Sequence, residues 1–363
     1  MTDRDGGRIS RRQLLAAAGF GAAVPLAAGG FSAMARAGVL EGSAAALLDK
    51  GAICTTPVAA AAGGADLIPL RFAWNTGAVC GAPVAAAQTS GIFEKHGLQV
   101  EFVNFAGSTE ALLETIATGK ADAGHGMALR WLKPLEQGFD VKIVAGLHSG
   151  CLRLLAGKDT GIATVADLRG KTVAISDLAS PSKHFFAIQL AKQGIDPESE
   201  VDWRVFPGEL LGAVIERGEA DAIAHWDPLT YKFLQSDQFV EVASNMDGEY
   251  ARRVCCIVGV RNSLLDENAE AVQRLTRALI EAQHFTAENP RIAAEAYQPF
   301  SPNTSIEDLE TQIRYHGHSH SPSGDALRQE LAQYTEELKL VGVMRPRTDP
   351  EKFADKIYAP VAV

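Results

Sequence analysis

The sequence predicts an α/β fold made of two similar half-molecules, each centred on a largely parallel sheet. Short apolar strands alternate with glycine-containing turns and helices along most of the chain, a pattern typical of such sheets. The segment Gly119-Lys120-Ala121-Asp122-Ala123-Gly124-His125 also recurs, as Gly218-Glu219-Ala220-Asp221-Ala222-Ile223-Ala224-His225. Both copies follow an amphipathic helix, so each indicates a helix that ends at glycine and a short buried strand that ends in histidine.

The order of the elements can be followed along the first half of the chain. Regular structure is expected to begin with a strand at Leu70–Trp74, after an Ala/Gly-rich tether over residues 38–69. A helix at Val84–Gln88 and a strand at Val100–Phe105 come next. Ser108 or Thr109 then caps a helix over Glu110–Thr118, which Gly119 ends.

The chain is expected to pass between the half-molecules twice. Strands at Val141–Leu147 and Cys151–Ala156 flank His148-Ser149-Gly150, which marks the first crossover. The apolar strand Val254–Val260 marks the return crossover. The remainder, residues 266–363, has mostly helical patterns.

Composition restricts the class of function. The chain has 363 residues, of which 47% are hydrophobic and 21% charged, as expected for a globular protein of two domains or one large one. A formal charge of −10 argues against binding to nucleic acid, which requires an excess of Lys and Arg. Five cysteines are too few for a disulfide scaffold, and the odd number leaves at least one unpaired.

Residues 1–37 are predicted to be a signal peptide. Ser10-Arg11-Arg12-Gln13-Leu14-Leu15 precedes an apolar run without acidic residues, and cleavage is expected near Ala37. The paired arginines before a weakly hydrophobic stretch favour the twin-arginine machinery and a periplasmic location, while an ordinary Sec leader is the alternative. No later stretch reaches the roughly 18 to 20 apolar residues that a membrane span requires.

Several segments together resemble periplasmic substrate-binding proteins of nitrate/sulfonate/taurine-type ABC importers and their thiamine-precursor relatives. They are Ser90–Val100, Gly107–Ala111, Gly119–Gly124, Val165–Val173, Gly218–Ala222 and Trp226-Asp227-Pro228. The resemblance implies a bilobal type II periplasmic-binding-protein fold, with lobe one at residues 70–149 and 257–363 and lobe two at 150–256. It implies a monomer that binds a small polar solute and delivers it to an ABC permease in the inner membrane.

The candidate ligand-binding residues follow predicted strand ends and helix starts. At Ser108 and Thr109 a helix start favours an anionic group, although plain N-capping explains the same residues. Glu209 and Asp227 would instead pair with a ligand amine, and solvated surface carboxylates are the alternative explanation. The full set is Asn75, Gly77, Cys80, Ala82, Ser108, Thr109, His125, His148, Cys151, Ser182, His184, Glu209, His225, Trp226 and Asp227.

Two alternative functions remain open, metal binding and an enzyme activity. Cys80, Cys151 and the Cys255-Cys256 pair fall near predicted strand ends beside histidines, which would suit a periplasmic metal-binding protein. Buried free cysteines, or a disulfide between the crossovers, explain the same pattern, so no metal or cofactor is assigned. The alternating histidines of the segment 316–320 are expected to lie in an exposed loop.

No catalytic fingerprint is found in the sequence, so the protein is expected not to be an enzyme. The nearest enzymatic relatives are thiamine-pyrimidine synthases, which use a cysteine-rich segment that Cys255-Cys256 matches only in part. An export leader fits poorly with that intracellular biosynthesis.

Overall fold

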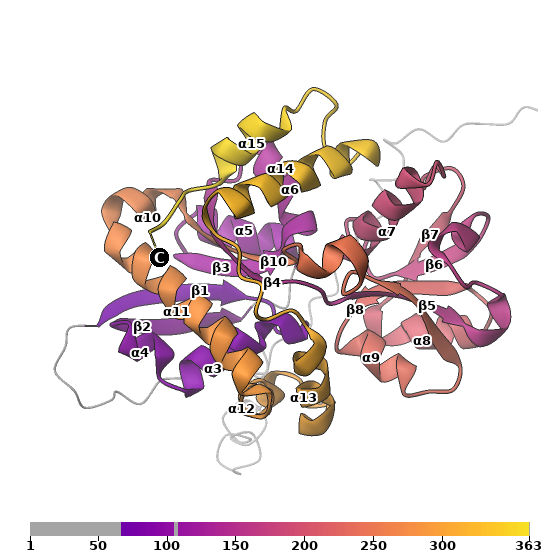
Figure 1. Ribbon diagram of the computed structural model, residues 1–363, viewed down its shortest axis with the longest axis horizontal. Coiled ribbons are helices and arrows are strands. Elements are labelled where there is room, and N and C mark those ends of the chain that lie inside the picture. Colours follow the sequence, from indigo (N-terminus) through magenta and orange to yellow (C-terminus); the bar gives the residue numbers. More distant parts are fainter. Residues whose placement is uncertain (1–66, 105–107, 363) are drawn as a thin grey trace, which may run out of the picture. The chain divides into compact units, whose positions relative to one another are not determined.

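The computed structural model describes residues 67–104 and 108–362, which form two five-stranded sheets surrounded by helices (Figure 1). The predicted signal peptide and residues 38–66 of the predicted tether lie outside the described residues. None of the described helices is both long and apolar enough to cross a membrane.

The first sheet has the strand order β2-β1-β3-β10-β4. Strand β1 pairs in parallel with β2 and β3, whereas β10 runs antiparallel to both β3 and β4. The strands are β1 (Ile68–Trp74), β2 (Leu98–Asn104), β3 (Ala123–Met127), β4 (Val141–His148) and β10 (Cys256–Arg261).

The second sheet repeats this arrangement with the order β7-β6-β8-β5-β9. Strand β6 is parallel to β7 and β8, and β5 is antiparallel to β8 and β9. The strands are β5 (Leu152–Gly157), β6 (Thr172–Ile175), β7 (Asp202–Val205), β8 (Ala222–Trp226) and β9 (Phe239–Ser244). The fourth strand in each order, β10 in the first sheet and β5 in the second, is antiparallel to its neighbours and is the first strand after a crossover. This shared arrangement confirms the prediction of two similar halves.

Helices cover both sheets. Those that follow first-sheet strands are α3 (Ala82–Thr89), α4 (Ile92–Lys95), α5 (Thr109–Ala117), α6 (Ala128–Gln137) and α10 (Asn262–Glu267), and those that follow second-sheet strands are α7 (Pro181–Lys192), α8 (Leu211–Glu216) and α9 (Leu229–Leu234). The C-terminal part contains α11 (Ala269–Glu288), α12 (Pro290–Tyr297), α13 (Ile306–Tyr315), α14 (Gly324–Leu340) and α15 (Pro350–Ile357). The expectation of a mostly helical C-terminal part is therefore confirmed.

The sequence repeat corresponds to one structural device used twice. The backbone N–H of Arg71 donates to the Asp122 carboxylate over 2.9 Å, and the backbone N–H of Thr172 donates to the Asp221 carboxylate over 2.8 Å. In each case the aspartate backbone N–H donates back to the carbonyl of the same partner over 2.8 Å. A repeated aspartate thus fixes the start of β3 beside β1 in the first sheet and the start of β8 beside β6 in the second.

Glycine begins both copies of the device because the backbone is left-handed there. Gly119 has φ +73° and Gly218 has φ +67°, values that side chains with a Cβ rarely adopt. The strands that follow, β3 and β8, do not end at His125 and His225 as expected. They continue to Met127 and Trp226, since ladder pairing with β10 and β5 extends that far.

The predicted boundaries shift by one or two residues. Strand β1 includes Ile68 and Pro69, which were expected to belong to the tether, because they pair with Leu98 and Gln99 of β2. Cys256, expected to be the last residue of lobe two, pairs with Met127 in the first sheet. The division of the chain into lobes otherwise remains a prediction.

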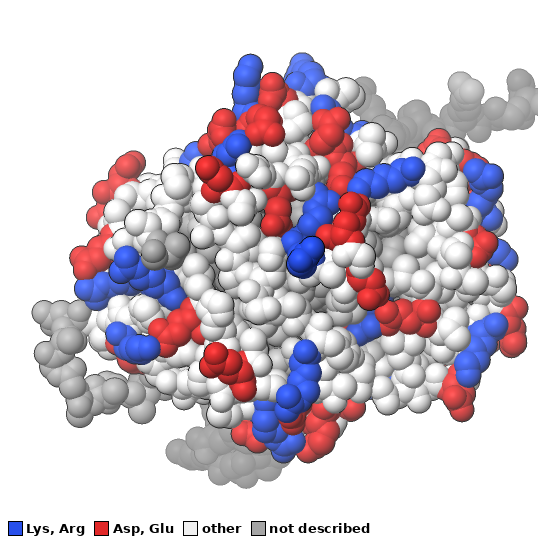
Figure 2. Space-filling view, viewed as in Figure 1, with Lys and Arg blue, Asp and Glu red and all other residues white. Residues whose placement is uncertain are grey.

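The charged side chains visible on one face of the protein are mixed in sign. Figure 2 shows blue and red atoms beside one another around the rim and over α14, with uncharged surface between them. Many charged side chains of the described residues form ion pairs, such as Arg328 with Glu351 and Asp355. Such solvated pairs contribute little to stability and mainly maintain solubility.

Candidate functional site

A cavity of about 400 Å³ lies between residues that belong to the two halves, a size suited to a small molecule. Segments around β1, α5, β3 and α6 line it from the first half, and the residues after β6 and at the end of β8 line it from the second. The lining residues are Asn75, Ala78, Cys80, Ser108, Thr109, Leu112, His125, Gly126, Met127, Arg130, Trp131, Ser176, Asp177, Ser180, Pro181 and Trp226.

Two helix N-termini reach the cavity. Ser108 is the N-cap residue of α5, and its Oγ accepts a hydrogen bond from Ala111 N over 3.2 Å. Ser180 is the N-cap residue of α7, but its hydroxyl contacts Ser182 Oγ at 2.7 Å instead of capping the helix. Free backbone N–H groups and the positive end of the helix dipole make both places favourable for a negatively charged group.

Arg130 places a buried positive charge at the wall of the cavity. Its side chain is only 9% exposed, and Nη2 lies 2.8 Å from Asp177 Oδ2 and 3.0 Å from Glu110 Oε2. Burial opposes ionisation of Asp177, but the hydrogen bond from Arg130 is strong enough to hold the pKa of that carboxyl below its ordinary value. Because Asp177 follows β6 whereas Arg130 lies in α6, the ion pair joins the two halves.

The remaining wall is apolar and aromatic. Trp131 is almost fully buried, and Trp226 is partly buried at the end of β8. The Trp226 Nε1–H donates to the carbonyl of Gly77 over 3.2 Å, which is a second polar contact between the halves. The His225 ring stacks on Trp226 with a centroid separation of 3.8 Å, so it supports the indole from behind.

Six of the predicted site residues line the cavity together: Asn75, Cys80, Ser108, Thr109, His125 and Trp226. Gly77 and Ala82 belong to the same turn as Cys80 but do not line the cavity. Ala82 begins α3 and is fully buried. Ser108 caps its helix, as one interpretation expected, and it also lines the cavity. Binding of an anionic group there stays a prediction.

The predicted residues of α7 are occupied by contacts within the protein. Ser182 Oγ donates to Ala224 O over 2.9 Å. His184 Nδ1 lies 3.1 Å from Leu129 O and therefore carries the proton that it donates. Burial lowers the pKa of His184 to about 4, and burial likewise lowers the pKa of His225 to about 4, so both rings are neutral near pH 7.

The two carboxylates expected to bind a ligand amine lie outside the cavity lining. Glu209 is exposed in a short 3-10 helix, Gly208–Leu210. Asp227 is fully buried and accepts hydrogen bonds from Arg153 Nε over 2.9 Å and Thr230 Oγ1 over 2.6 Å, with His316 Nε2 at 3.0 Å. Burial opposes its ionisation, but these partners lower the pKa of Asp227 to about 2. Its charge is therefore already balanced inside the protein.

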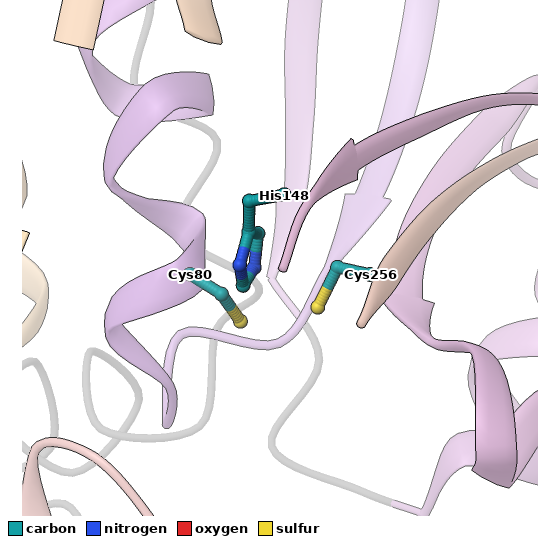
Figure 3. Close-up of side chains that lie close together, drawn as sticks. All are labelled: Cys80, His148 and Cys256. Atoms are coloured by element: carbon teal, nitrogen blue, oxygen red, sulfur yellow. The ribbon is translucent and has the colours of Figure 1, made fainter. Parts of the chain in front are cut away.

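The predicted cysteines and His148 gather in a buried cluster beside the cavity. One donor atom each of Cys80, His148 and Cys256 lies within 4.8 Å of the other two (Figure 3). Cys151 Sγ lies 3.6 Å from Cys255 Sγ, so no disulfide joins them. Hydrogen bonds from Cys151 and Cys256 hold the pKa of the Cys80 thiol well below its ordinary value, although burial acts in the opposite direction.

The expectation of an exposed loop for the histidine-rich segment is wrong. His316 is 4% exposed and His318 is 1% exposed. The reason is a pair of backbone hydrogen bonds between Gly317 and Ser149, which holds the segment against the first crossover. Both imidazoles consequently lie inside the protein, next to His148.

Several lining residues were not predicted: Ala78, Leu112, Met127, Arg130, Trp131, Ser176, Asp177 and Pro181. For Arg130 and Asp177 the sequence contains a usable signal. Arg130 lies a few residues beyond the predicted strand that contains His125, and Asp177 closely follows the apolar run Val173–Ile175. Ligand sites of α/β folds concentrate at such strand ends. Leu112 and Trp131 carry no such signal, since apolar helical residues usually pack in the core.

The repeated sheet topology and the cavity between the halves define a bilobal binding-protein fold. The same fold is found in the periplasmic aliphatic sulphonate binding protein SsuA from Escherichia coli, with a TM-score of 0.69 and 16% identity over 80% of this chain and 97% of that one. The periplasmic nitrate-binding protein NrtA from Synechocystis PCC 6803 has a TM-score of 0.66 and 15% identity, over 81% of this chain and 86% of that one.

The chain belongs to the NMT1/THI5 like family, whose sequence profile matches residues 81–293. A Brucella abortus (strain 2308) protein, provisionally named a binding protein, is 26% identical over 252 residues, which cover 69% of this chain and 76% of that protein. The resemblance stated from the sequence is thus confirmed for family and fold.

Proposed function

We propose that this protein is the solute-binding component of an ABC importer and that it holds a small solute with an anionic group in the cavity between its lobes. The observation that carries the proposal is the placement of two helix N-termini, those of α5 and α7, at one cavity lined from both lobes. Closure of two lobes over a ligand is the ordinary working cycle of such a fold.

The polar groups of the cavity favour an anion over an amine. Ser108, Thr109 and Ser180 offer hydroxyls at the helix starts, where negative charge is stabilised by about 0.3–1 kcal/mol per helix. The carboxylate that lines the cavity, Asp177, already accepts a hydrogen bond from Arg130. An incoming sulfonate or carboxylate can share the Arg130 guanidinium, whereas an amine would have to compete with it.

The apolar wall suggests that the solute has a carbon-containing remainder. Leu112, Met127 and Trp131 provide apolar surface next to the polar groups, and Trp226 provides a ring face. This favours an organic sulfonate or carboxylate over nitrate. The relatives named for sulphonate and nitrate binding support an oxyanion ligand in general.

Location and partners belong to the same proposal. The segment Ser10–Leu15 supports export by the twin-arginine machinery and cleavage near Ala37, which would release a monomer into the periplasm. There it would deliver the solute to a permease in the inner membrane. We propose a binding role rather than a catalytic one.

A thermal-shift screen of sulfonates, carboxylates, nitrate and amines tests the proposal. A solute at one hundred times its dissociation constant stabilises the folded protein by about 2.7 kcal/mol. We expect anionic organic solutes to do so and Arg130→Gln to weaken binding about tenfold or more. Arg291→Gln, which removes an exposed arginine from a surface ion-pair group, is the matched control and should bind normally.

Stabilisation by amines alone would contradict the anionic assignment. If no solute of any of these classes stabilises the folded protein, the proposed binding function is wrong.

A further inference from the structure

The cluster beside the cavity has the composition and geometry of a metal site. Cys80 comes from the short 3-10 helix η2 (Val79–Gly81), His148 from the end of β4, and Cys256 from the start of β10. Their donor atoms lie within 4.8 Å of one another, and the three residues are at most 3% exposed. Figure 3 shows both thiols and the imidazole directed toward one common space.

The orientation of the His148 ring leaves one nitrogen available. Nδ1 lies 3.2 Å from the carbonyl oxygen of Ser149, so this nitrogen carries the proton and donates it. Nε2 is buried and has no hydrogen-bond partner. A buried polar atom without a partner is costly, and a metal-bound histidine shows this arrangement, with one N–H fixed by a carbonyl and the other nitrogen free to bind.

Two neighbouring imidazoles show the same arrangement. His316 Nε2 lies 3.0 Å from the Asp227 carboxylate and leaves a buried Nδ1 without a partner, while His318 Nδ1 lies 3.0 Å from Gln283 Oε1 and leaves a buried Nε2 without one. Their ring centroids lie 6.2 Å and 5.3 Å from that of His148. The cluster therefore contains more buried imidazole nitrogens than the described protein groups satisfy.

We propose that Cys80, His148 and Cys256 bind one thiophilic divalent metal ion, with Zn²⁺ as the first candidate. Thiolate and neutral imidazole are the donors that zinc prefers. Two thiolates, one neutral imidazole and a divalent ion sum to zero charge, which a fully buried site requires because an uncompensated buried charge is expensive. Cys151 and Cys255, 3.6 Å apart, supply further thiols next to the site.

The site differs in role from the solute cavity. Cys80 lies in the first turn of the fold, His148 lies where the first crossover begins, and Cys256 lies where the return crossover ends. A bound ion would therefore connect the segments about which the lobes move. Cys80 also lines the cavity, which gives an ion a route to the buried donors. The proposal does not depend on which solute the cavity binds.

Metal content of the exported wild-type protein is the first test. We expect one zinc ion per chain, and after chelation we expect added Co²⁺ to produce thiolate-to-cobalt charge-transfer absorption. Cys80→Ser and His148→Gln should each weaken Zn²⁺ binding by more than about 100-fold. Loss of a group that only hydrogen-bonds to a metal ligand already weakens metal binding by about 10- to 100-fold. His96→Gln, which alters a histidine bonded to Glu281 near the surface, and Cys54→Ser, outside the described residues, should bind normally.

Alkylation of the folded wild-type protein provides a test that needs no variant. Zn²⁺ should protect at least two thiols, and peptide mass mapping should place Cys80 and Cys256 among them. Absence of bound metal together with Zn²⁺-independent alkylation would overturn the proposal, as would a native disulfide that includes either cysteine. Solute binding, measured separately, distinguishes this failure from failure of the proposed function.

Discussion

Asp227 illustrates how single residues hold the core of this protein together. The carboxylate is completely buried, and it remains ionised because Arg153 and His316 contact it from different elements. An isolated charge in such a place would be unstable, whereas a paired one with satisfied hydrogen bonds is tolerated. The contacts tie the end of β8 to β5 and to the residue after α13.

Asp227→Asn is expected to reduce the free energy of unfolding by about 3 kcal/mol, because it removes the buried charge that pairs with Arg153 and His316 and leaves Arg153 only its contact with Glu241. Urea unfolding monitored by circular dichroism measures the change. Asp237→Asn, at a fully exposed carboxylate, is the control and should change stability by less than about 0.5 kcal/mol. Equal stability of the two variants would contradict the ionised buried pair.

The pKa of Asp227 also predicts acid sensitivity. Its value of about 2 in the folded protein lies below the roughly 3.9 of an unfolded chain, so its stabilising effect is complete above about pH 4. The effect, about 3 kcal/mol, is lost mostly as the pH falls from about 4 to 2. Stability curves of the wild type and Asp227→Asn should therefore converge over that range, and parallel curves would contradict the assignment.

Helix α7 contacts helix α6 through His184, whose Nδ1–H donates to the carbonyl oxygen of Leu129. Arg130 and Lys183 face this ring and disfavour its protonation, Asp177 favours it, and burial has the largest effect. A protonated ring would keep this hydrogen bond but would be a buried cation beside Arg130, so the folded protein holds the ring neutral. Because its folded pKa, about 4, lies below the roughly 6.5 of an unfolded histidine, the unfolded chain binds the proton first.

We expect stability to decline as the pH falls from about 6.5 to 4, by about 3 kcal/mol for His184 alone. His184→Asn retains a donor near the position of Nδ1 but cannot titrate, so its stability should depend less on pH in this range. Thermal unfolding at a series of pH values measures the difference. If wild type and variant lose stability in parallel between pH 6.5 and 4, His184 is not the titrating group.

Elements were more predictable than the site they form. Strands such as Val141–Leu147, and the two helices that end at glycine with the strands after them, depend on local pattern and were expected at nearly the observed positions. The contacts of the repeated aspartates and the burial of the segment around His316 were not predicted, because their partners lie far away in sequence. Pairing between Gly317 and Ser149 buries the histidines, and no local pattern reports such a contact.

At the scale of the whole molecule, the two lobes meet in a few polar contacts around the cavity. They are Arg130 with Asp177, Trp226 with Gly77, His184 with Leu129, and the backbone N–H of Val79 with the carbonyl of Asp227 at 3.3 Å. Elsewhere the lobes also meet through His316 with Asp227 and through Glu337 with Lys192 and Arg253, so opening about the two crossovers has to break or shift these contacts as well. A solute that touches both lobes would add contacts and favour the closed arrangement.

Asp177→Asn should therefore shift the solute-free protein toward an open arrangement, because it weakens the ion pair between the lobes. Small-angle X-ray scattering should report a larger radius of gyration for this variant than for the wild type, and saturating solute should bring the two values together. Asp237→Asn again serves as the control. Identical scattering of the wild type and Asp177→Asn without solute would show that the ion pair between Arg130 and Asp177 does not hold the lobes closed.

Titration calorimetry on a variant in which the cavity is filled shows whether a solute occupies the cavity between the lobes. Thr109→Trp adds an indole at the first residue of α5, where the cavity is lined, and Thr311→Trp makes the same change on an exposed face of α13. With the solute selected by the thermal-shift screen, we predict one site per chain in the wild type and in Thr311→Trp, and loss of binding in Thr109→Trp. Unchanged affinity in a folded Thr109→Trp protein would show that the solute binds elsewhere.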